Sequence, residues 1–388
     1  MKAPRVLLVT NQDWFFLSHR LALARAIRDE GGEVVVVAGE TGKGEVVRRA
    51  GFPFVALPIL RAGIAPRREL GTVTFLARLY RRVRPDLVHH VTLKPVLYGS
   101  LAARFAGDVA VVNTLSGLGY AFTSSEARAR LARLCVQLLC RVTLTRPRSR
   151  TIFQNPEDRE DFVRLGLVAG AQAVVIRGSG VDCSLFRPGP ELPGDPIVML
   201  PSRMLWDKGV REFVDAAAAI RGRGRNARFV LVGAPDYGNP SAVPAAQLEA
   251  WSLDGAVEWW GHRDDMPAVL SQASVVVLPT VYGEGVPKVL IEAAASARPI
   301  VATDARGCRE IARPGVNGLL VAAGDAADLA RAIETLLASP ELRRRFGAAG
   351  REIAVAEFTE EAVVAQTLAV YRELLGARCF TAGRCERA

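Results

Sequence analysis

Histidine is scarce in this sequence of 388 residues, which contains four, and none of its six cysteines belongs to a C-x-x-C pair. Zinc sites need several His and Cys ligands at short spacing, so this composition excludes a zinc site. Unpaired cysteines at irregular spacing also favour a reducing compartment over a disulfide framework. We therefore expect no metal and no cofactor, and a cytoplasmic setting.

Long apolar runs and two common nucleotide motifs are also absent. Every apolar run is far shorter than the ~20 residues that a membrane-spanning helix needs, and the one near the N-terminus is too short for a signal peptide. No G-x-G-x-x-G follows the first strand-like run, where the sequence reads TNQDWFF, which argues against dinucleotide binding. No D-x-D motif is present to hold a metal-bound nucleotide.

The charge is unevenly distributed over a chain long enough for two domains. Residues 1–188 hold 28 Lys and Arg against 15 Asp and Glu, whereas residues 189–388 hold 22 against 25. A basic first half indicates contact with an anionic surface, either nucleic acid or an acidic membrane. Aromatic residues are not interleaved with the arginines, which weakens the nucleic-acid alternative. The predicted partner is an anionic membrane surface, with no nucleic acid.

Short β-branched runs alternate with helical patterns in both halves. This order predicts the α/β class, with two doubly wound parallel sheets. A stretch rich in Gly and Pro, 173–196, is interpreted as a linker, which predicts domains at 1–188 and 189–357 and a C-terminal segment at 358–388. The predicted strands are 5–10, 33–38, 52–58, 86–91, 109–114, 151–155, 197–204, 228–234, 256–261, 274–279, 299–303 and 318–322.

The stretch VYGEGVPKVLIEAAASARPIVATD, 281–304, follows one of these strands and carries two glutamates at E-x7-E spacing. Glu284 lies on a loop between two glycines, and Glu292 lies in the helix that Pro287 begins. The N–H groups around Gly285, Val286 and Lys288 at that helix start form a place to hold phosphate. The spacing alone also fits a loop Glu and a solvated helix Glu.

The sequence GEGVPKVLIEA followed by RPIVATD resembles the donor-site signature of the retaining family 4 glycosyltransferases of GT-B fold. The resemblance implies two Rossmann-like domains facing a cleft, with a final helix near 358–376 that returns to the first domain. It implies that Glu284 contacts the donor sugar and that Glu292 contacts the ribose of the nucleotide. It also implies a UDP-sugar as co-substrate.

The motif PSRMLWDKGV, 201–210, follows the first strand of the second half. Arg203 and Lys208 can neutralise a nucleotide diphosphate. The same sequence pattern also fits two solvated surface cations. The match to the family's SR-x5-KG form implies that they hold the diphosphate. The segment WWGHRDDMP, with Gly261 and His262, resembles the family's loop beside the nucleotide base, and His262 also fits a plain loop residue.

The first half carries segments expected on the acceptor side. DLVHHVTLKPVLYGS and VNTLSGLGYAFTS resemble the subset of the family that extends polyprenyl-diphosphate-linked sugars, the undecaprenol-linked N-acetylgalactosaminyltransferases among them. Many relatives carry a second His two positions after the first, where this chain has Val91, so a role for His89 or His90 stays open. The residues that we expect to line the acceptor side are His19, Thr92, Lys94, Gly117 and Gly119.

The stretch EARARLARLCVQLLCRVTLTRPRSR, 126–150, places Leu131, Leu134, Cys135, Leu138 and Leu139 on one apolar helix face bordered by arginines. One interpretation is a domain helix with its apolar face in the core. The other is an interfacial helix that rests on an anionic bilayer. The second would bring the protein to a lipid-linked acceptor on the inner face of the cell membrane.

These observations predict a metal-independent retaining glycosyltransferase that moves a sugar from a UDP-sugar to a polyprenyl-diphosphate-linked saccharide. Glu284, Arg203 and Lys208 are the predicted catalytic residues, and the two glutamates act as binders rather than as a glycosidase pair. Two alternatives remain: a nucleotide-sugar epimerase of the same fold, and a non-catalytic basic GT-B module.

Overall fold

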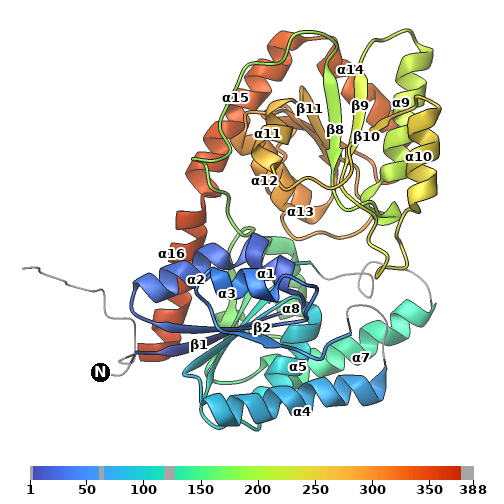
Figure 1. Ribbon diagram of the computed structural model, residues 1–388. Coiled ribbons are helices and arrows are strands. Elements are labelled where there is room, and N and C mark those ends of the chain that lie inside the picture. Colours follow the sequence, from blue (N-terminus) through green and yellow to red (C-terminus); the bar gives the residue numbers. More distant parts are fainter. Residues whose placement is uncertain (1–2, 61–64, 118–126, 377–388) are drawn as a thin grey trace, which may run out of the picture. The chain divides into compact units, whose positions relative to one another are not determined.

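The computed structural model describes residues 3–60, 65–117 and 127–376, which fold into two compact units (Figure 1). Residues 1–179 and 361–388 form the first unit, and Gly180–Glu360 form the second. In the described ranges, no helix is both long enough and apolar enough to cross a membrane.

The first unit contains a parallel sheet of seven strands in the order β3-β2-β1-β4-β5-β6-β7. The order reverses direction between β1 and β4, which is the switch point of a doubly wound sheet. The strands are β1 (Arg5–Thr10), β2 (Glu33–Ala38), β3 (Phe54–Ala56), β4 (Leu87–Val91), β5 (Ala110–Leu115), β6 (Ser149–Phe153) and β7 (Ala173–Val175).

Helices cover both faces of this sheet because successive side chains of each strand point to opposite faces. Val6 and Leu8 of β1 pack with α1, α2 and α16, whereas Leu7 and Val9 pack with α4 and α5. The helices of the unit are α1 (Asp13–His19), α2 (Leu21–Asp29), α3 (Gly44–Arg49), α4 (Pro66–Val83), α5 (Leu93–Ala103), α7 (Ala127–Leu144), α8 (Pro156–Arg164), η1 (Gly170–Gln172) and the C-terminal α16 (Glu360–Leu375).

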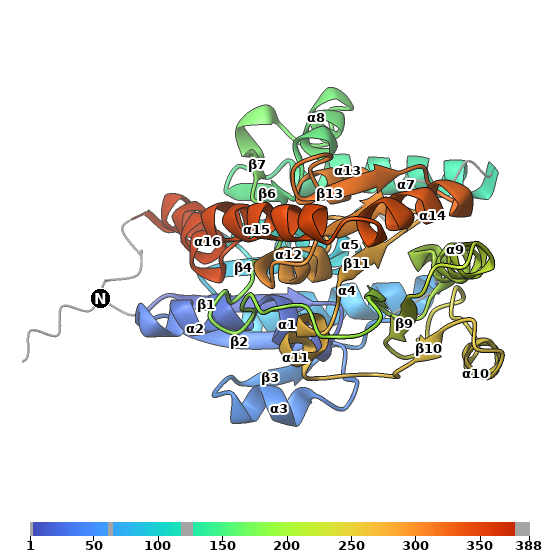
Figure 2. The ribbon, with the colours of Figure 1, turned by 90° about the horizontal axis from the view of Figure 1, so that it is seen from above.

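The second unit contains a parallel sheet of six strands in the order β10-β9-β8-β11-β12-β13, with its switch point between β8 and β11. Helices α9, α10 and α14 cover one face, and α11, α12, α13 and α15 cover the other (Figure 2). The strands are β8 (Ile197–Pro201), β9 (Arg228–Val232), β10 (Glu258–Trp259), β11 (Val275–Leu278), β12 (Ile300–Thr303) and β13 (Gly318–Val321). The helices are η2 (Trp206–Lys208), α9 (Val210–Gly222), α10 (Ala245–Leu253), α11 (Met266–Ser271), α12 (Lys288–Ala295), α13 (Arg306–Arg309), α14 (Ala326–Leu337) and α15 (Pro340–Glu357).

The predicted linker 173–196 is in part wrong, because its first residues form β7 and extend the first sheet. Its later residues belong to the second unit, which begins at Gly180 rather than at residue 189. Val181 and Phe186 are buried in the second core, and Arg351 donates to the carbonyl oxygens of Cys183 and Phe186. Apolar side chains and arginine contacts thus make this Gly- and Pro-rich stretch part of a folded unit.

Candidate functional site

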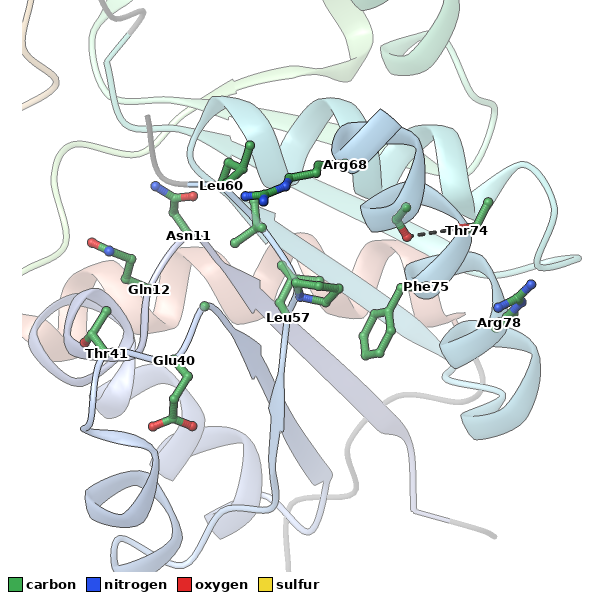
Figure 3. Close-up of a pocket in the computed structure, with 14 residues that line it drawn as sticks. Asn11, Gln12, Glu40, Thr41, Leu57, Leu60, Arg68, Thr74, Phe75 and Arg78 are labelled. Carbon is green, nitrogen blue, oxygen red and sulfur yellow. Dashed lines mark hydrogen bonds between the residues drawn. The ribbon is translucent and has the colours of Figure 1, made fainter. Parts of the chain in front are cut away.

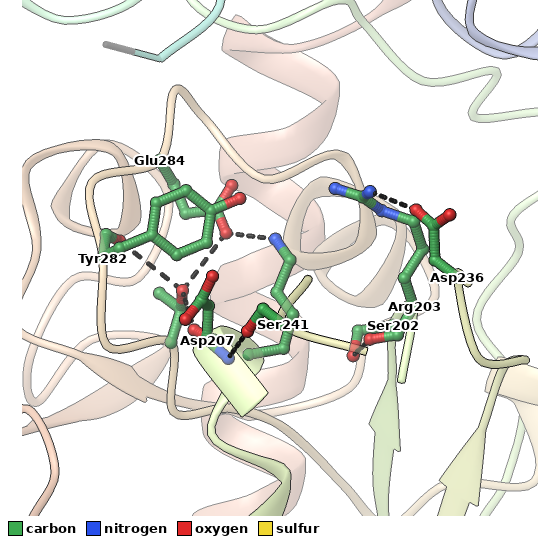
Figure 4. A network of polar contacts seen from close by, with 9 residues as sticks. Ser202, Arg203, Asp207, Asp236, Ser241, Tyr282 and Glu284 are labelled. Atoms are coloured by element: carbon green, nitrogen blue, oxygen red, sulfur yellow. Dashed lines mark hydrogen bonds and ion pairs between the residues drawn. The ribbon is translucent and has the colours of Figure 1, made fainter. Parts of the chain in front are cut away.

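Two loops of the second unit meet at the carboxyl ends of β8 and β11, where open parallel sheets bind ligands. The loop after β8 carries Arg203 and Lys208, and the loop after β11 carries Thr280 to Glu284. The backbone oxygen of Asp207 accepts from the N–H of Val281 at 2.9 Å and from the hydroxyl of Thr280 at 3.1 Å (Figure 4). These bonds hold the two loops together.

Lys208 and Glu284 form an ion pair, and Thr280 Oγ1 lies 3.2 Å from the same carboxylate oxygen (Figure 4). The pair is largely buried, with side chains 12% and 14% exposed. Burial disfavours the charged form of Lys208, but the charge of Glu284 outweighs it and keeps the pKa of Lys208 above its usual value. The ammonium therefore stays charged and can also meet an anion.

Arg203 lies on the same edge and pairs with Asp236, with 2.8 Å between Nη1 and the carboxylate (Figure 4). Asp236 is buried and anchors the guanidinium, whose side chain is 38% exposed. Both predicted diphosphate cations are thus held by carboxylates and presented at one edge of the sheet.

Helix α12 begins at Lys288, directly after Gly285, Val286 and Pro287. The helix thus begins one residue after Pro287, where the sequence predicted its start, and it ends at Ala295. Proline sets the backbone at the position before the first helical residue, so the chain enters the helix sharply. The E-x7-E spacing therefore places Glu284 on the loop before α12 and the second glutamate in the second turn of α12.

Glu292 lies in that second turn, mostly buried, with Lys288 Nζ 3.9 Å from its carboxylate. Burial raises the pKa of Glu292 to about 7, against a smaller opposing effect of the Lys288 charge. A strongly raised pKa marks a buried carboxyl group as a candidate binding-site residue.

Gly261 and His262 lie on the loop after β10. Gly261 adopts a left-handed conformation, with φ at 69°, and its carbonyl oxygen accepts from the N–H of Gly233 at 2.7 Å. This bond ties the loop to the carboxyl end of β9. His262 is exposed and lies 3.2 Å from Asp264, which fits the plain loop residue that the sequence left open.

His19 ends α1 in the first unit, where its ring stacks on Phe15 with 4.1 Å between centroids and its Nδ1 contacts Ser18. Thr92 follows β4 with φ at 76°, a conformation that costs a β-branched residue about 1–3 kcal/mol and clusters at functional sites. The hydroxyl oxygen of Thr92 is buried without a hydrogen-bond partner among the described residues.

Lys94 binds protein groups in this structure. Its Nζ lies 2.9 Å from Glu69 Oε1 and 2.9 Å from the carbonyl oxygen of Leu60. Gly117 has a φ of 113°, which glycine alone adopts readily. Gly119 lies outside the described residues.

His89 and His90 are buried side by side in β4. His89 contacts Tyr371 at 2.6 Å and Thr114 at 2.7 Å. His90 contacts Tyr80 at 2.9 Å and Asn113 at 2.8 Å. Burial lowers the pKa of both rings, to about 4 for His90. Through these contacts the two histidines join α4 and α16 to the sheet.

Helix α7 divides the described part of the predicted apolar face between the core and the surface. Leu138 is 65% exposed and Val142 is 46% exposed, whereas Leu139, Cys140 and Leu144 pack in the core. The side chains of Leu131, Leu134 and Cys135 lie outside the described residues. The helix therefore has a core face and also leaves apolar groups at the surface.

Sequence reasoning missed Asp236, Thr280, Tyr282 and Gly307. Lys208 Nζ lies 5.5 Å from the ring centroid of Tyr282, and an added Cβ at Gly307 would clash with the carbonyl oxygen of Gly285. Tyr282 lies within the stretch 281–304 and Thr280 directly precedes it, so both could have been found there. Asp236 lies on the loop after β9 and Gly307 lies in α13, and no local pattern marked either residue.

Two family models match most of the chain between them. A model described as "Glycosyl transferase 4-like" matches residues 5–152, and one described as "Glycosyl transferases group 1" matches residues 195–339. The chain is also similar to the N,N'-diacetylbacillosaminyl-diphospho-undecaprenol alpha-1,3-N-acetylgalactosaminyltransferase of Campylobacter jejuni, with 27% identity over 93% of this chain and 98% of that protein. A putative glycosyltransferase EpsD of Bacillus subtilis is 27% identical over 95% of this chain and 96% of its own.

Solved structures agree on the fold. HepE of Anabaena in complex with UDP has a TM-score of 0.76 at 20% identity, covering 95% of this chain and all of that one. Sucrose-phosphate synthase of Thermosynechococcus elongatus has a TM-score of 0.79 at 21% identity, covering 96% of this chain and 100% of that one. The chain belongs to the glycosyltransferases of the GT-B fold. Its first half is of the glycosyl transferase 4-like type and its second half is of the group 1 type.

Proposed function

We propose that this glycosyltransferase moves a sugar from a UDP-sugar to a polyprenyl-diphosphate-linked saccharide, with retention of the anomeric configuration and without a metal ion. The observation that carries the proposal is the Lys208–Glu284 pair beside Arg203 at one sheet edge. Two cations fit a nucleotide diphosphate, and a carboxylate fits sugar hydroxyl groups. The name of the Campylobacter relative, with its diphospho-undecaprenol acceptor, supports the acceptor class.

The chemistry follows from charge. The bond between the anomeric carbon and the diphosphate oxygen breaks, and a bond from that carbon to the acceptor oxygen forms on the same face. The acceptor's proton passes to the departing phosphate oxygen, so the protein needs no base. Arg203 and Lys208 stabilise the charge that develops on the diphosphate, which is preorganised electrostatic catalysis. Glu284 binds the sugar and Glu292 the ribose.

The acceptor's polyprenyl tail places the reaction at a membrane, and we propose that the protein associates peripherally with the inner face of the cell membrane. The excess of Lys and Arg in residues 1–188 supports attraction to anionic lipid. The exposed Leu138 and Val142 of α7 supply apolar contact area.

The test is transfer itself. Purified protein in EDTA is incubated with a panel of labelled UDP-sugars and a farnesyl-diphosphate-linked N-acetylhexosamine, and products are separated by chromatography. We expect one UDP-sugar to extend the acceptor. Consumption of a UDP-sugar only to an isomerised sugar would instead indicate an epimerase, and a strict need for added Mg²⁺ or Mn²⁺ would contradict the metal-free mechanism.

A further inference from the structure

Tyr282 lies on the loop after β11, two residues before Glu284, and has no role in the reaction proposed above. The backbone around it is fixed by two contacts. The N–H of Val281 donates to the carbonyl oxygen of Asp207 at 2.9 Å, and the hydroxyl of Thr280 lies 3.5 Å from the carbonyl oxygen of Tyr282 itself. The side chain is therefore held at the sheet edge that carries the two cations.

The aromatic ring of Tyr282 lies beside the Lys208–Glu284 pair. Nζ of Lys208 is 5.5 Å from the ring centroid, which is within the range of a cation–π contact. In Figure 4 the phenol end of the side chain points toward Glu284. The side chain is partly buried, so the ring shields one side of the ion pair from water.

The hydroxyl group of Tyr282 is a donor without a protein acceptor. In the described ranges it has no hydrogen-bond partner, whereas the carboxylate of Glu284 already accepts from Lys208. The charge of Glu284, together with burial, raises the pKa of Tyr282 against the smaller opposing effects of the two cations. The phenol therefore keeps its proton at neutral pH and can donate to a ligand.

The charges around the phenol indicate which part of a ligand it would meet. Four charged groups act on it, two acidic and two basic: Glu284, Asp207, Lys208 and Arg203. In the proposed function, Lys208 and Arg203 hold the diphosphate and Glu284 holds the sugar. A phenol beside Lys208 and Glu284 thus lies where the sugar and its phosphate are joined. Phosphate oxygens are charged acceptors, which form stronger hydrogen bonds with a neutral hydroxyl than sugar oxygens do.

We propose that Tyr282 is a further catalytic residue, whose hydroxyl donates a hydrogen bond to the sugar-linked phosphate of the donor. The inference rests on the proposed function, which supplies the UDP-sugar. As the bond between the anomeric carbon and the phosphate oxygen breaks, negative charge collects on that phosphate and the hydrogen bond strengthens. The phenol keeps its proton throughout, and the acceptor's proton still passes to the departing phosphate oxygen.

The test compares UDP with UMP, which lacks the phosphate that Tyr282 would contact, by calorimetric titration. We expect Tyr282→Phe to weaken UDP binding at least 10-fold and to leave UMP binding within 2-fold of wild type. Phenylalanine keeps the ring beside Lys208, so the variant should unfold at the same temperature as wild type. The matched control is Tyr237→Phe, which removes the hydroxyl of a tyrosine that is 75% exposed on the loop after β9. It should leave both affinities within 2-fold of wild type.

Two arginines of the first unit offer a second place for an anion. Arg68 and Arg78 of α4 line a pocket of about 880 Å³, with Phe75 between them (Figure 3). Arg68→Ala/Arg78→Ala should leave the ratio of UDP to UMP affinity within 2-fold of wild type, because the diphosphate binds in the second unit. A fall of that ratio as large as in Tyr282→Phe would place the diphosphate at this pocket and overturn the inference.

The remaining outcomes separate this inference from the proposed function. Equal losses of UDP and UMP affinity in Tyr282→Phe, or a UDP affinity within 2-fold of wild type, would each remove the role of Tyr282. If wild type prefers UDP over UMP in either case, the proposed function still stands. Wild type that binds UDP no more tightly than UMP would contradict the diphosphate site, and with it both the proposed function and this inference.

Discussion

Lys208 and Glu284 illustrate how one pair of residues can serve both stability and binding. Each would be costly to bury alone, because an isolated charge loses its hydration. Together they remain charged inside the edge of the second sheet. In the proposed function, a diphosphate would meet an ammonium that Glu284 has already oriented.

Removing only Lys208 should therefore have two effects. Lys208→Met leaves Glu284 buried without its cation, which costs about 3–5 kcal/mol of folding free energy. It also removes a charged hydrogen bond to UDP that contributes roughly 1.5–3 kcal/mol, about 10-fold or more in Kd. The double variant Lys208→Met/Glu284→Gln should recover much of the stability but not the UDP affinity. Thermal unfolding and UDP titration of both variants check this, and recovery of UDP binding in the double variant would contradict the role of Lys208.

Arg203→Ala independently tests whether a second cation at the same sheet edge contributes to UDP binding. Because its partner Asp236 is buried, the variant should be less stable than wild type. Its affinity for UDP should fall by about 10-fold or more. Arg211→Ala, an exposed arginine that stacks on Trp206, is the control and should bind UDP as wild type does. Unchanged UDP affinity in both Arg203→Ala and Lys208→Met would remove the diphosphate assignment.

The raised pKa of Glu292 predicts that the stability of the protein depends on pH. Because its pKa in the folded protein is about 7, above the reference value of 4.5, the folded state binds the proton more tightly than the unfolded state does. Its contribution to the free energy of unfolding therefore falls as pH rises from 4.5 to about 7 and then stays constant. Urea unfolding at pH 5 and pH 8 should show a smaller loss in Glu292→Gln than in wild type. The exposed control Glu249→Gln should match wild type, and so a Glu292→Gln profile identical to wild type would contradict the raised pKa.

At the scale of elements, the loops at the carboxyl edge of the second sheet fit together through glycines. Gly307 at α13 faces the carbonyl oxygen of Gly285, and Gly209 faces that of Pro279. In both places a Cβ would overlap backbone atoms, so the approach of two loops requires glycine. The position of Glu284 thus depends on a short helix that follows a different strand.

Gly307→Ala should push the Gly285 backbone away and displace Glu284. We expect lower stability by about 1–3 kcal/mol and weaker binding of a UDP-sugar, with a smaller effect on UDP alone. Gly222→Ala, at the end of α9 with open space around it, is the control and should be neutral or stabilising. A Gly307→Ala protein with wild-type affinity for UDP-sugar would show that α13 does not position Glu284.

Strands could be predicted from the sequence where a local run of apolar residues marks them. Each of the twelve predicted strand ranges overlaps a strand of the structure, and the apolar runs 33–38 and 274–279, for example, contain β2 and β11. β7 was missed because three residues, AVV, stand within a Gly- and Pro-rich stretch. The partners of Lys94 and Arg203 could not be predicted, because Glu69 and Asp236 lie 25 and 33 residues away and meet them only after folding.

At the scale of the whole molecule, the proposed membrane association rests on a basic first half and on exposed apolar groups. Arg146, Arg148 and Arg150 end the stretch 126–150 and are candidate membrane contacts by their charge. These side chains bind protein groups in the first unit: carbonyl oxygens of Ala103 and Gly107, Asp108, and Glu373. Their substitution would disturb the fold, so apolar residues make the sharper test.

We expect wild type to bind vesicles that contain anionic lipid, and to bind less in high salt because ions screen the arginines. Leu138→Glu/Val142→Glu should reduce vesicle binding and leave UDP affinity unchanged. Leu253→Glu changes a residue of the second unit that is 87% exposed and should have no effect on either. Sedimentation with vesicles at low and high salt makes the comparison, and wild type that ignores anionic vesicles at low salt would point to a soluble acceptor.

The anomeric configuration of the sugar in the extended acceptor, formed in EDTA from an α-linked UDP-sugar, tests the proposed reaction most directly. It requires donor binding, transfer and acceptor recognition together, and the coupling constant of the anomeric proton reports the outcome by NMR. We predict an α-linked product in the presence of EDTA, and its loss in Lys208→Met/Glu284→Gln. A β-linked product, or a product that forms only when a divalent metal is added, would contradict the retaining, metal-independent transfer proposed for this chain.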